Sequence, residues 1–487
     1  MLGGDTAGGQ PGKAVRRVSR LGIAVAILGP WAGGASALLA IVTARPAYAQ
    51  VQPAAQSGAL TLGEALAYAD AHYPAVKAAL SERVAADREV TVARTAYLPR
   101  VDLLAQINRA TVNNITGVVL PQQVIPSITG AVVPETGRSA WNSAGGVLGS
   151  WRIFDFGQRA AAVDVERQGA AAASADYDLT RLDVAAATLS AYLNILASEA
   201  LVVTAQANVD RLAAFGKAVH VLVDNKLRAG VEGSQADAAL ADAQALLLGA
   251  RNDVIVQRAT LSRLLGRPAD RLALALPDPP PDVATLFTNG RPVTDHPAVV
   301  AADARASQQR ARVAVAARSF APVVDVIGAG YGRGSGRDPR DGSGLGFNTT
   351  NWAAGVQVTF PLGAIPRARA ERSARSAELD AQRDRYDETV RTVTEKRAQA
   401  RAGLDTAIAI ANVVPAQMRA ARDAESQQRA RFQNGLATAV DVTVAEDVLA
   451  RAESQDAIAR LNVWRAIGAA AVAQGDLAPV TAALAAR

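Results

Sequence analysis

Apolar residues recur through residues 158–227 at alternating spacings of three and four positions. The stripe they form is Leu179, Leu182, Ala186, Leu189, Leu193, Leu196, Ala200, Val203 and Ala207. This heptad pattern is typical of a helix whose seam packs against neighbouring helices. The stretch contains no proline and holds 70 residues, so one unbroken helix would be about 105 Å long. No compact globular core needs a helix of that length, and the strand-like string 150–157 leads directly into it.

Residues 97–110 follow a period of two, because apolar positions alternate there with positions that are mostly polar. The apolar positions are Val101, Leu103, Ala105 and Ile107. A period of two predicts a strand with one apolar and one polar face. Before this strand we expect a short helix and a longer one within 60–96, separated by a break near Tyr73-Pro74. After it we expect a proline-containing loop at about 111–140 and a second strand at about 141–156. The long helix then ends in a break at Gly230 to Ser234, and a returning helix follows at about 235–265.

The pattern then starts again, which indicates an internal repeat. His296-Pro297 echoes Tyr73-Pro74, and in both halves a second proline follows 25 residues later. The expected elements of the second half are strands at 323–331 and 352–360, a long helix at about 366–433 with Pro415 as an expected kink, a break at Gly435, and a last helix at 438–474. The break follows Gly363 by 72 residues, against 73 between Gly157 and Gly230. Two spacings that agree this closely predict two copies of one structural unit.

The sequence divides into five segments on this reading. These are an export signal at 1–49, a first repeat at 50–265, a linker at 266–295, a second repeat at 296–477 and a C-terminal tail at 478–487. A basic region ends at Arg20, an uncharged apolar segment follows, and Ala47-Tyr48-Ala49 is a small-x-small cleavage site. The alternative is a retained membrane anchor, because the uncharged segment is long enough to span a bilayer.

Charge and composition exclude several classes of protein. The chain has no cysteine, which removes disulfides and thiolate chemistry. Outside residues 1–49, 46 basic and 44 acidic residues remain, so charge gives no indication of nucleic-acid binding. His72, His220 and His296 lack metal-ligand spacing, and we find no phosphate-binding loop, nucleophile elbow or acid–base pair. We therefore expect neither an enzyme nor a cofactor-binding or metal-binding protein.

Four strands with apolar faces are too few to close a membrane barrel, since the smallest such barrels have about eight. Open sheet edges are not tolerated in hydrocarbon, so we expect several chains to share one barrel that continues into a helical tube. Two alternatives remain at this point. One is an envelope coiled coil without a pore, and the other is a periplasmic binding or enzymatic module, for which the sequence offers no convergent polar site.

The chain resembles the TolC-like outer membrane efflux and secretion channels from Leu60 to Leu477. The resemblance rests on the duplicated Pro-Ala-Val strings, the strings that end at Gly157 and Gly363, and the breaks followed by Ser234-Gln-Ala-Asp237 and Thr438-Ala-Val-Asp441. It implies a mainly α-helical protein with a membrane β-barrel. Long helical hairpins would form a periplasmic α-barrel, and four strands per protomer would complete a shared 12-stranded barrel in a homotrimer.

The resemblance also implies a function, partners and a location. The protein would be a passive exit duct in the outer membrane of a Gram-negative bacterium, with a large periplasmic part. A periplasmic adaptor (membrane fusion) protein would join it to an inner-membrane pump or ABC transporter. Outer-membrane lipid is a further implied partner. Drug or metal efflux and type I protein secretion both remain open.

Candidate site residues lie where the long helices end. Gly230, Ser234, Gly435 and Thr438 form the turns, where glycine allows a tight reversal and the hydroxyls can cap the next helix. The resemblance implies that the adaptor contacts these turns. Asp441 matches an acidic position of the family's constricted entrance, with Asp237 as its counterpart in the first repeat and Phe432 in place of a tyrosine partner. The alternative for Asp441 is an aspartate stabilised by the helix dipole. Ala437 and Val444 stand where the family's arginine and second aspartate would be, so that latch does not carry over.

Overall fold

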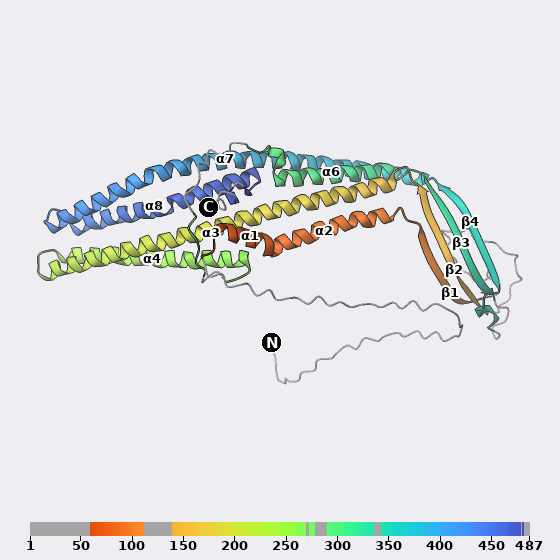
Figure 1. The fold of residues 1–487 in the computed structure, drawn as a ribbon, viewed down its shortest axis with the longest axis horizontal. Coiled ribbons are helices and arrows are strands. Elements are labelled where there is room, and N and C mark those ends of the chain that lie inside the picture. The colour runs from red at the N-terminus through yellow and green to blue at the C-terminus, as the bar shows by residue number, and fades with distance from the viewer. Residues whose placement is uncertain are drawn as a thin grey trace, which may run out of the picture. The chain divides into compact units, whose positions relative to one another are not determined.

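The computed structural model describes residues 59–111, 139–268, 272–277, 290–335, 342–478 and 480–481, all within the unit Gln56–Arg487. The elements of the first half are α1 (Leu62–His72), α2 (Pro74–Thr95), β1 (Arg100–Thr111), β2 (Ser139–Phe154), α3 (Gln158–Asp224) and α4 (Gly230–Leu265). Those of the second half are α6 (Pro297–Arg318), β3 (Val323–Ser335), β4 (Thr349–Thr359), α7 (Ile365–Gln433) and α8 (Ala439–Gln474), with short 3₁₀ turns at Val293–Asp295, Ser343–Leu345 and Leu362–Ala364. The predicted mainly helical fold with four strands is confirmed (Figure 1). The expected export signal at 1–49 and nearly all of the loop expected at about 111–140 lie outside the described residues.

The internal repeat is visible helix by helix. Both α2 and α6 have 22 residues and begin with proline at a first-turn position, where the missing N–H costs no hydrogen bond. Both α4 and α8 have 36 residues and end at a left-handed glycine, Gly266 or Gly475. Every residue of α8 therefore lies 209 positions after its counterpart in α4. The long helices α3 and α7 have 67 and 69 residues, so the helices of the two halves agree closely in length.

Helix pairing follows the apolar stripes. α3 packs against α4 and α8 towards its C-terminal end and against α2 and α6 towards its N-terminal end, and α7 packs against α6 and α8. Leu182, Leu189, Leu193 and Leu196 of the predicted stripe are buried, whereas Val203 is 69% exposed. An 18-residue window of α3 is apolar enough to cross a membrane by length and composition alone. Within the protomer, 44% of that window is buried.

The main core ties the first segment of the first repeat, Leu60 and α1, to α3. Tyr192 on α3 is fully buried, and its hydroxyl lies 2.6 Å from the Leu60 carbonyl and 2.7 Å from the Ala275 carbonyl. Leu60 forms a parallel bridge with Leu274, so part of the expected linker packs onto the first repeat. α1 begins there with a capping box, in which Thr61 and Glu64 each bond the other's backbone N–H.

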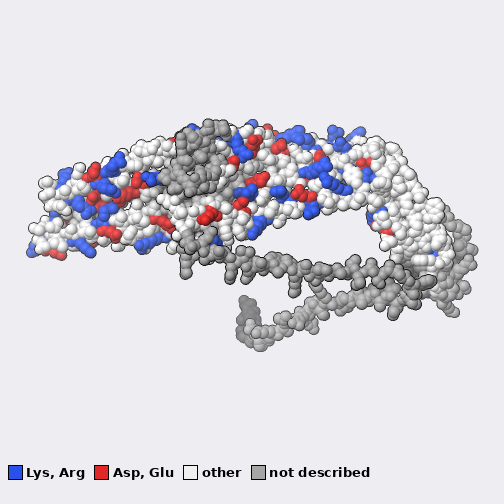
Figure 2. All heavy atoms as spheres, in the orientation of Figure 1, with Lys and Arg blue, Asp and Glu red and all other residues white. Residues whose placement is uncertain are grey.

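The four strands form one antiparallel sheet in the order β1-β2-β3-β4. Its register confirms the predicted faces. Val101 and Leu103 lie on one face with Val147, Trp151, Val326, Trp352 and Val356, because paired positions of an antiparallel sheet share a face. The other face carries Asp102, Gln106, Arg152, Asp325 and Gln357. Leu103 is 85% exposed and Trp352 is 84% exposed, so the apolar face is uncovered in the protomer. The sheet end carries few charges on the face shown in Figure 2.

Strand β2 turns into α3 around one buried carboxylate. Asp155 accepts hydrogen bonds from the backbone N–H of Gly157 at 3.1 Å and of Arg159 at 3.2 Å. Gly157 has a φ of 84°, a conformation that favours glycine. Its counterpart by sequence, Gly363, lies in a 3₁₀ turn after Pro361 and has no positive φ. The two glycines thus serve the same junction by different backbone routes.

Candidate functional site at the tips of the helical hairpins

The turns that join α3 to α4 and α7 to α8 have the same hydrogen bonds, shifted by 209 positions. Each turn contains an Asn-x-Leu string, at 225–227 and at 434–436. The matching backbone bonds are Asn225 to Val221, Lys226 to Val223 and Leu227 to Leu222 in the first turn, and Asn434 to Ala430, Gly435 to Phe432 and Leu436 to Arg431 in the second. In both turns the asparagine side chain also donates to the carbonyl four residues earlier. The tips are therefore two copies of one structure.

This register corrects the predicted correspondence between the repeats. The left-handed residue is Gly435 in the second turn, with a φ of 75°, and Lys226 in the first, with a φ of 59°. Gly230, which was matched to Gly435, is instead the first residue of α4 and has no positive φ. Asp441 corresponds to Glu232, so the pairing of Asp237 with Asp441 was also wrong.

The two predicted capping residues have different roles. Thr438 is the N-cap of α8, as predicted, and its hydroxyl accepts from the Asp441 N–H at 3.3 Å. Ser234 is not a cap, because it lies inside α4, whose N-cap is Ala229 without a side-chain hydrogen bond. Helix α4 begins at Gly230 rather than at the predicted position of about 235, because the turn before it closes through backbone hydrogen bonds around Lys226.

Asp441 completes the capping box of α8. One of its oxygens, Oδ2, accepts from both the backbone N–H and the hydroxyl of Thr438, each at 2.8 Å. These hydrogen bonds lower the pKa of Asp441 below its ordinary value of 3.8. The residue is exposed, so a charged carboxylate stands at the tip throughout the neutral pH range. The capping role is shown directly, and it leaves the charge free to act on ions.

Phe432 is buried between the two hairpins rather than exposed at the tip surface. Its ring meets that of Phe215 edge-on, with centroids 5.2 Å apart. The Arg228 guanidinium lies 4.6 Å from the Phe432 ring centroid, and it donates to the Phe432 carbonyl at 3.0 Å. Phe432 thus packs the α3–α4 hairpin against the α7–α8 hairpin. Any effect of Phe432 on the entrance would therefore come from the position in which it holds the two hairpins.

Arg228 and Glu232 form the polar part of this link. Arg228 Nη1 and Glu232 Oε1 lie 3.6 Å apart. Glu232 also accepts a hydrogen bond from the Ala439 backbone N–H of the other hairpin at 3.3 Å. Sequence reasoning missed both residues. Arg228 is the counterpart of Ala437 in the first turn, so the arginine absent from the second repeat is present in the first. The repeated Asn-x-Leu string was the signal that would have placed it.

Asp237 lies further along α4 and pairs with a histidine of α3. His220 Nε2 and Asp237 Oδ1 are 2.8 Å apart on the surface. This hydrogen bond raises the pKa of His220 above its ordinary value of 6.5. In the second repeat the same positions, 209 residues later, hold Arg429 and Glu446, which also form an ion pair.

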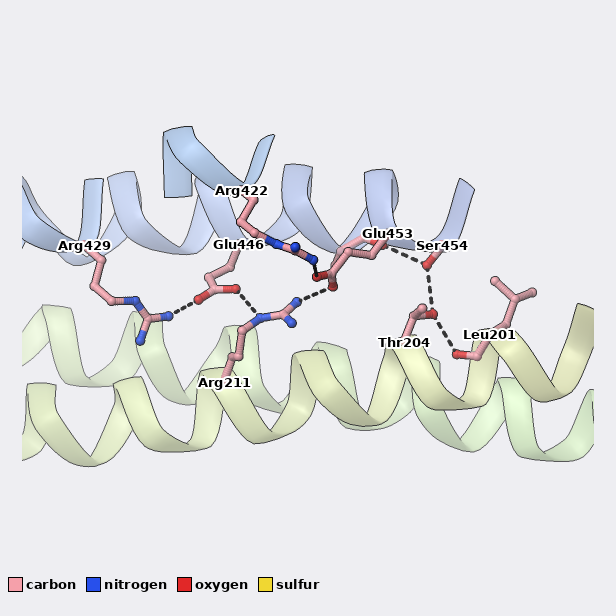
Figure 3. A network of polar contacts seen from close by, with 9 residues as sticks. Leu201, Thr204, Arg211, Arg422, Arg429, Glu446, Glu453 and Ser454 are labelled. Atoms are coloured by element: carbon pink, nitrogen blue, oxygen red, sulfur yellow. Dashed lines mark hydrogen bonds and ion pairs between the residues drawn. The ribbon is translucent and has the colours of Figure 1, made fainter. Parts of the chain in front are cut away.

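A buried network of charges surrounds Glu446, and sequence reasoning missed it as well (Figure 3). Glu446 on α8 is fully buried, accepts from Arg211 of α3 at 2.9 Å, and is also bound by Arg429 of α7. Burial and the neighbouring Glu425 carboxyl raise the pKa of Glu446. Arg211 reaches Glu453 of α8 as well, at 3.0 Å. Three helices are thus joined through charges placed between the hairpins.

No group of three or more potential metal ligands occurs in the described parts of the chain. The elements together define a membrane-channel subunit. A sheet with one uncovered apolar face continues into paired helices that end in matching charged tips.

Comparison with known proteins identifies the family. The model of the outer membrane efflux protein family matches residues 65–267 and 294–469, and the chain belongs to this family. It forms an exit duct for efflux in the outer membrane, with a large periplasmic helical part. Among curated proteins, no sequence matches this chain.

Solved structures share the fold at low sequence identity. The outer membrane protein VceC of Vibrio cholerae has a TM-score of 0.71 and 21% identity, over 85% of this chain and 96% of VceC. The CmeC outer membrane channel of Campylobacter jejuni has a TM-score of 0.70 and 16% identity, over 85% of each chain. The open state of the MtrE outer membrane channel of Neisseria gonorrhoeae has a TM-score of 0.66 and 19% identity, over 85% of this chain and 89% of MtrE.

Proposed function

We propose that three copies of this chain close one membrane barrel and continue into one helical tunnel. The observation that supports this is the four-stranded sheet, in which β1 and β4 pair on one side only within the described residues. Unpaired strand edges are not tolerated in hydrocarbon, and closed membrane barrels start at about eight strands. Three copies would supply twelve strands, with β1 of one protomer beside β4 of the next.

The helical part has unpartnered apolar faces that fit the same assembly. On α4, Leu246, Leu248 and Ile255 are exposed, and on α7 the same holds for Ile410 and Val413. Packing between protomers would remove these side chains from water, a contribution of about 25 cal/mol per Å² of apolar surface. Trimerisation would thus complete both the sheet and the helical wall.

The tips would form the periplasmic entrance of a passive conduit that catalyses no reaction. Leu227 and Leu436 are both 69% exposed at the ends of the hairpins, and apolar side chains beside charged ones suit a protein partner. We therefore propose that the two tips contact a periplasmic adaptor protein, the first through its turn and the first residues of α4, which include Gly230 and Ser234, and the second through Gly435 and Thr438. The adaptor would link the duct to an inner-membrane pump or ABC transporter. Asp441 would provide the charge of the entrance, with Asp237 further along the hairpin and Phe432 fixing the position of the hairpins.

The proposal also covers the export signal and the boundaries of the two repeats. Residues 1–49 would be removed as an export signal, and the repeats at 50–265 and 296–477 would be joined by the linker at 266–295, with a tail at 478–487. Drugs and metals fit this efflux duct equally well as cargo, and type I protein secretion is a further proposed use of it.

Cross-linking across the proposed protomer boundary tests this assembly. The chain contains no cysteine, so Ala105→Cys in β1 and Ala354→Cys in β4 introduce the only thiols. Both alanines are exposed on the apolar face of the edge strands. Treatment of the double variant in membranes with a bis-maleimide should yield covalent dimers and trimers.

The single-cysteine variants serve as controls, because β1 would not neighbour another β1. They should remain monomeric on a denaturing gel. A double variant that stays monomeric while both thiols react with a monofunctional maleimide would rule out the shared barrel. A ladder that extends beyond three chains would rule out the trimer.

A further inference from the structure

A cavity of about 1300 Å³ lies between α3, α6, α7 and α8. It occurs where α8 ends at Gln474 and α6 begins at Pro297, while α3 and α7 run past without a break. Small residues on two walls, among them Gly403 of α7 and Ala466 of α8, leave the space open, and leucines of α3 form the third wall. Ligand pockets of proteins have volumes of about 300–1000 Å³, so this cavity has room for a small molecule.

The cavity is lined by a half-buried arginine, Arg465 of α8. Its guanidinium donates to the side-chain oxygens of Asn462 at 2.7 Å and Asn194 at 2.8 Å. Its Nε is buried and has no hydrogen-bond partner in the described residues. Burial lowers the pKa of Arg465, and no carboxylate offsets that effect. Arg465 is partly exposed, and its acceptors among the described residues are the neutral oxygens of Asn462, Asn194 and Leu193, so its guanidinium can still take an anion.

The other charges that line the cavity do not supply the missing anion. Arg305 is paired with Asp176 at 2.5 Å. Asp183 lies at the His296 end, where it and Lys396 act on that histidine with opposite signs. Arg385 and Glu388 are one helical turn apart on α7 and balance each other in charge. Arg465 therefore gives the cavity a net positive centre against apolar walls.

The first repeat has no cation at the corresponding position. The residue 209 positions before Arg465 is Val256 of α4, which is 50% exposed. The position of Asp253 in the first repeat corresponds to Asn462 in the second, so the side chain next to Arg465 in the second repeat is neutral.

We propose that this cavity binds an amphipathic monoanion, with its acidic head group on Arg465 and its apolar body along the leucines of α3. A carboxylate or phosphodiester head would accept charge-assisted hydrogen bonds from the guanidinium. The apolar body would account for the walls. Such a molecule is either an exported compound or a single-chain membrane lipid, since the two share this chemistry.

Equilibrium binding to the full-length protein in a non-ionic detergent tests the proposal. The probe is 11-(dansylamino)undecanoic acid, and its methyl ester is the neutral match. The acid should bind saturably and more tightly than the ester. Arg465→Met should weaken acid binding about tenfold or more and leave ester binding unchanged, since a tenfold loss corresponds to one charged hydrogen-bonded contact. Arg465→Lys should restore most of the acid preference.

Two further variants distinguish binding in the cavity from an effect of charge or hydrophobicity elsewhere on the protein. Arg451→Met removes an exposed arginine of the same helix that pairs with Asp447 on the surface, and it should change neither probe. A side chain at Gly403 would meet nothing within 4 Å of its Cβ, so Gly403→Phe should fill the cavity without disturbing the helices and weaken both probes.

The outcomes decide the matter even if one variant fails to fold. Equal binding of acid and ester, or unchanged acid binding in the folded Arg465→Met or Gly403→Phe variant, would overturn the proposal. Displacement of the probe by lysophosphatidylglycerol but not by 2-naphthoate would identify a lipid as the occupant, and the reverse would identify a soluble carboxylate. Because the test measures binding alone, failure of the trimeric assembly would not mimic its failure.

Discussion

Two acidic residues near the same tip have opposite surroundings. Asp441 is exposed and receives two hydrogen bonds from Thr438, which lower its pKa. Glu446 is fully buried, and desolvation raises its pKa. The first is suited to present a fixed negative charge to solvent. The second acts inside the protein, where it joins Arg211 to Arg429.

Replacement of Asp441 by asparagine separates its charge from its capping role, because the amide oxygen can still accept from Thr438. If three copies meet at the entrance, Asp441→Asn should raise the concentration of a trivalent cation that blocks the channel by about tenfold. The lowered pKa keeps Asp441 ionised, so block of the wild type should be the same at about pH 8 and about pH 5. Asp447→Asn, an exposed position on the same helix, is the control, and unchanged block in Asp441→Asn would remove the proposed role.

His296 should make the protein less stable in mild acid. Burial lowers the pKa of His296 below 6.5, so the unfolded chain binds the proton more readily than the native state does. Stability then falls as pH drops below 6.5, by at most about 1.4 kcal/mol per pH unit. His296 Nδ1 accepts from the Ala298 N–H as the N-cap of α6. His296→Asn keeps a capping oxygen and should flatten this pH dependence in thermal unfolding. An equal effect of His72→Asn, at an exposed position, would contradict the assignment.

At the scale of elements, the two turns use the same hydrogen bonds with different residues at the left-handed position. Lys226 adopts there a conformation that is unfavourable for most side chains, whereas Gly435 adopts it without strain. Gly435→Ala should destabilise the protein by about 1 kcal/mol in thermal unfolding followed by circular dichroism. Gly249→Ala is the control, because this glycine lies inside α4 with open space around it. It should stabilise by about 0.5–1 kcal/mol, and two effects of the same sign would refute the turn assignment.

The charge network should dominate the attachment of α3 to α8. Glu446→Ala leaves Arg211 and Arg429 without their shared acceptor. Loss of one partner of a buried ion pair costs about 3–5 kcal/mol, which urea unfolding can measure. Asp447→Ala, one residue away in an exposed pair, should cost at most about 1 kcal/mol. Similar losses in the two variants would show that the buried network does not hold the helices together.

The sequence predicts features that depend on neighbouring residues better than features that depend on contacts between distant parts of the chain. Helix and strand spans were predicted well because their periods are local: the strand faces at Val101 and Leu103 and the core position of Leu193 agree with the structure. The first turn was misplaced because Gly230 was taken as the reversal, while backbone bonds place it at Lys226. Arg211 and Glu446 are 235 positions apart, so only tertiary structure brings them together.

The whole molecule is a doubled unit that is incomplete by itself. Each repeat contributes two strands and one long hairpin, and the repeats are joined through the sheet, through the packing of α3 on α6 and α8, and through the tips. The apolar face of the sheet and the exposed leucines of α4 remain uncovered in one protomer. Membership of the outer membrane efflux protein family accounts for both features. A shared barrel would cover the first with lipid and the second with neighbouring protomers.

Single-channel recording in a planar bilayer, with the mass of the detergent-purified complex determined alongside, tests the central claim most directly. The account predicts discrete ion-conducting steps from the trimeric fraction and none from a monomeric fraction. Arg228→Ala, which removes the contact between the hairpins at Phe432, should increase the open time. A folded trimer that conducts no ions even with this substitution, or a monomer that conducts, would contradict the account.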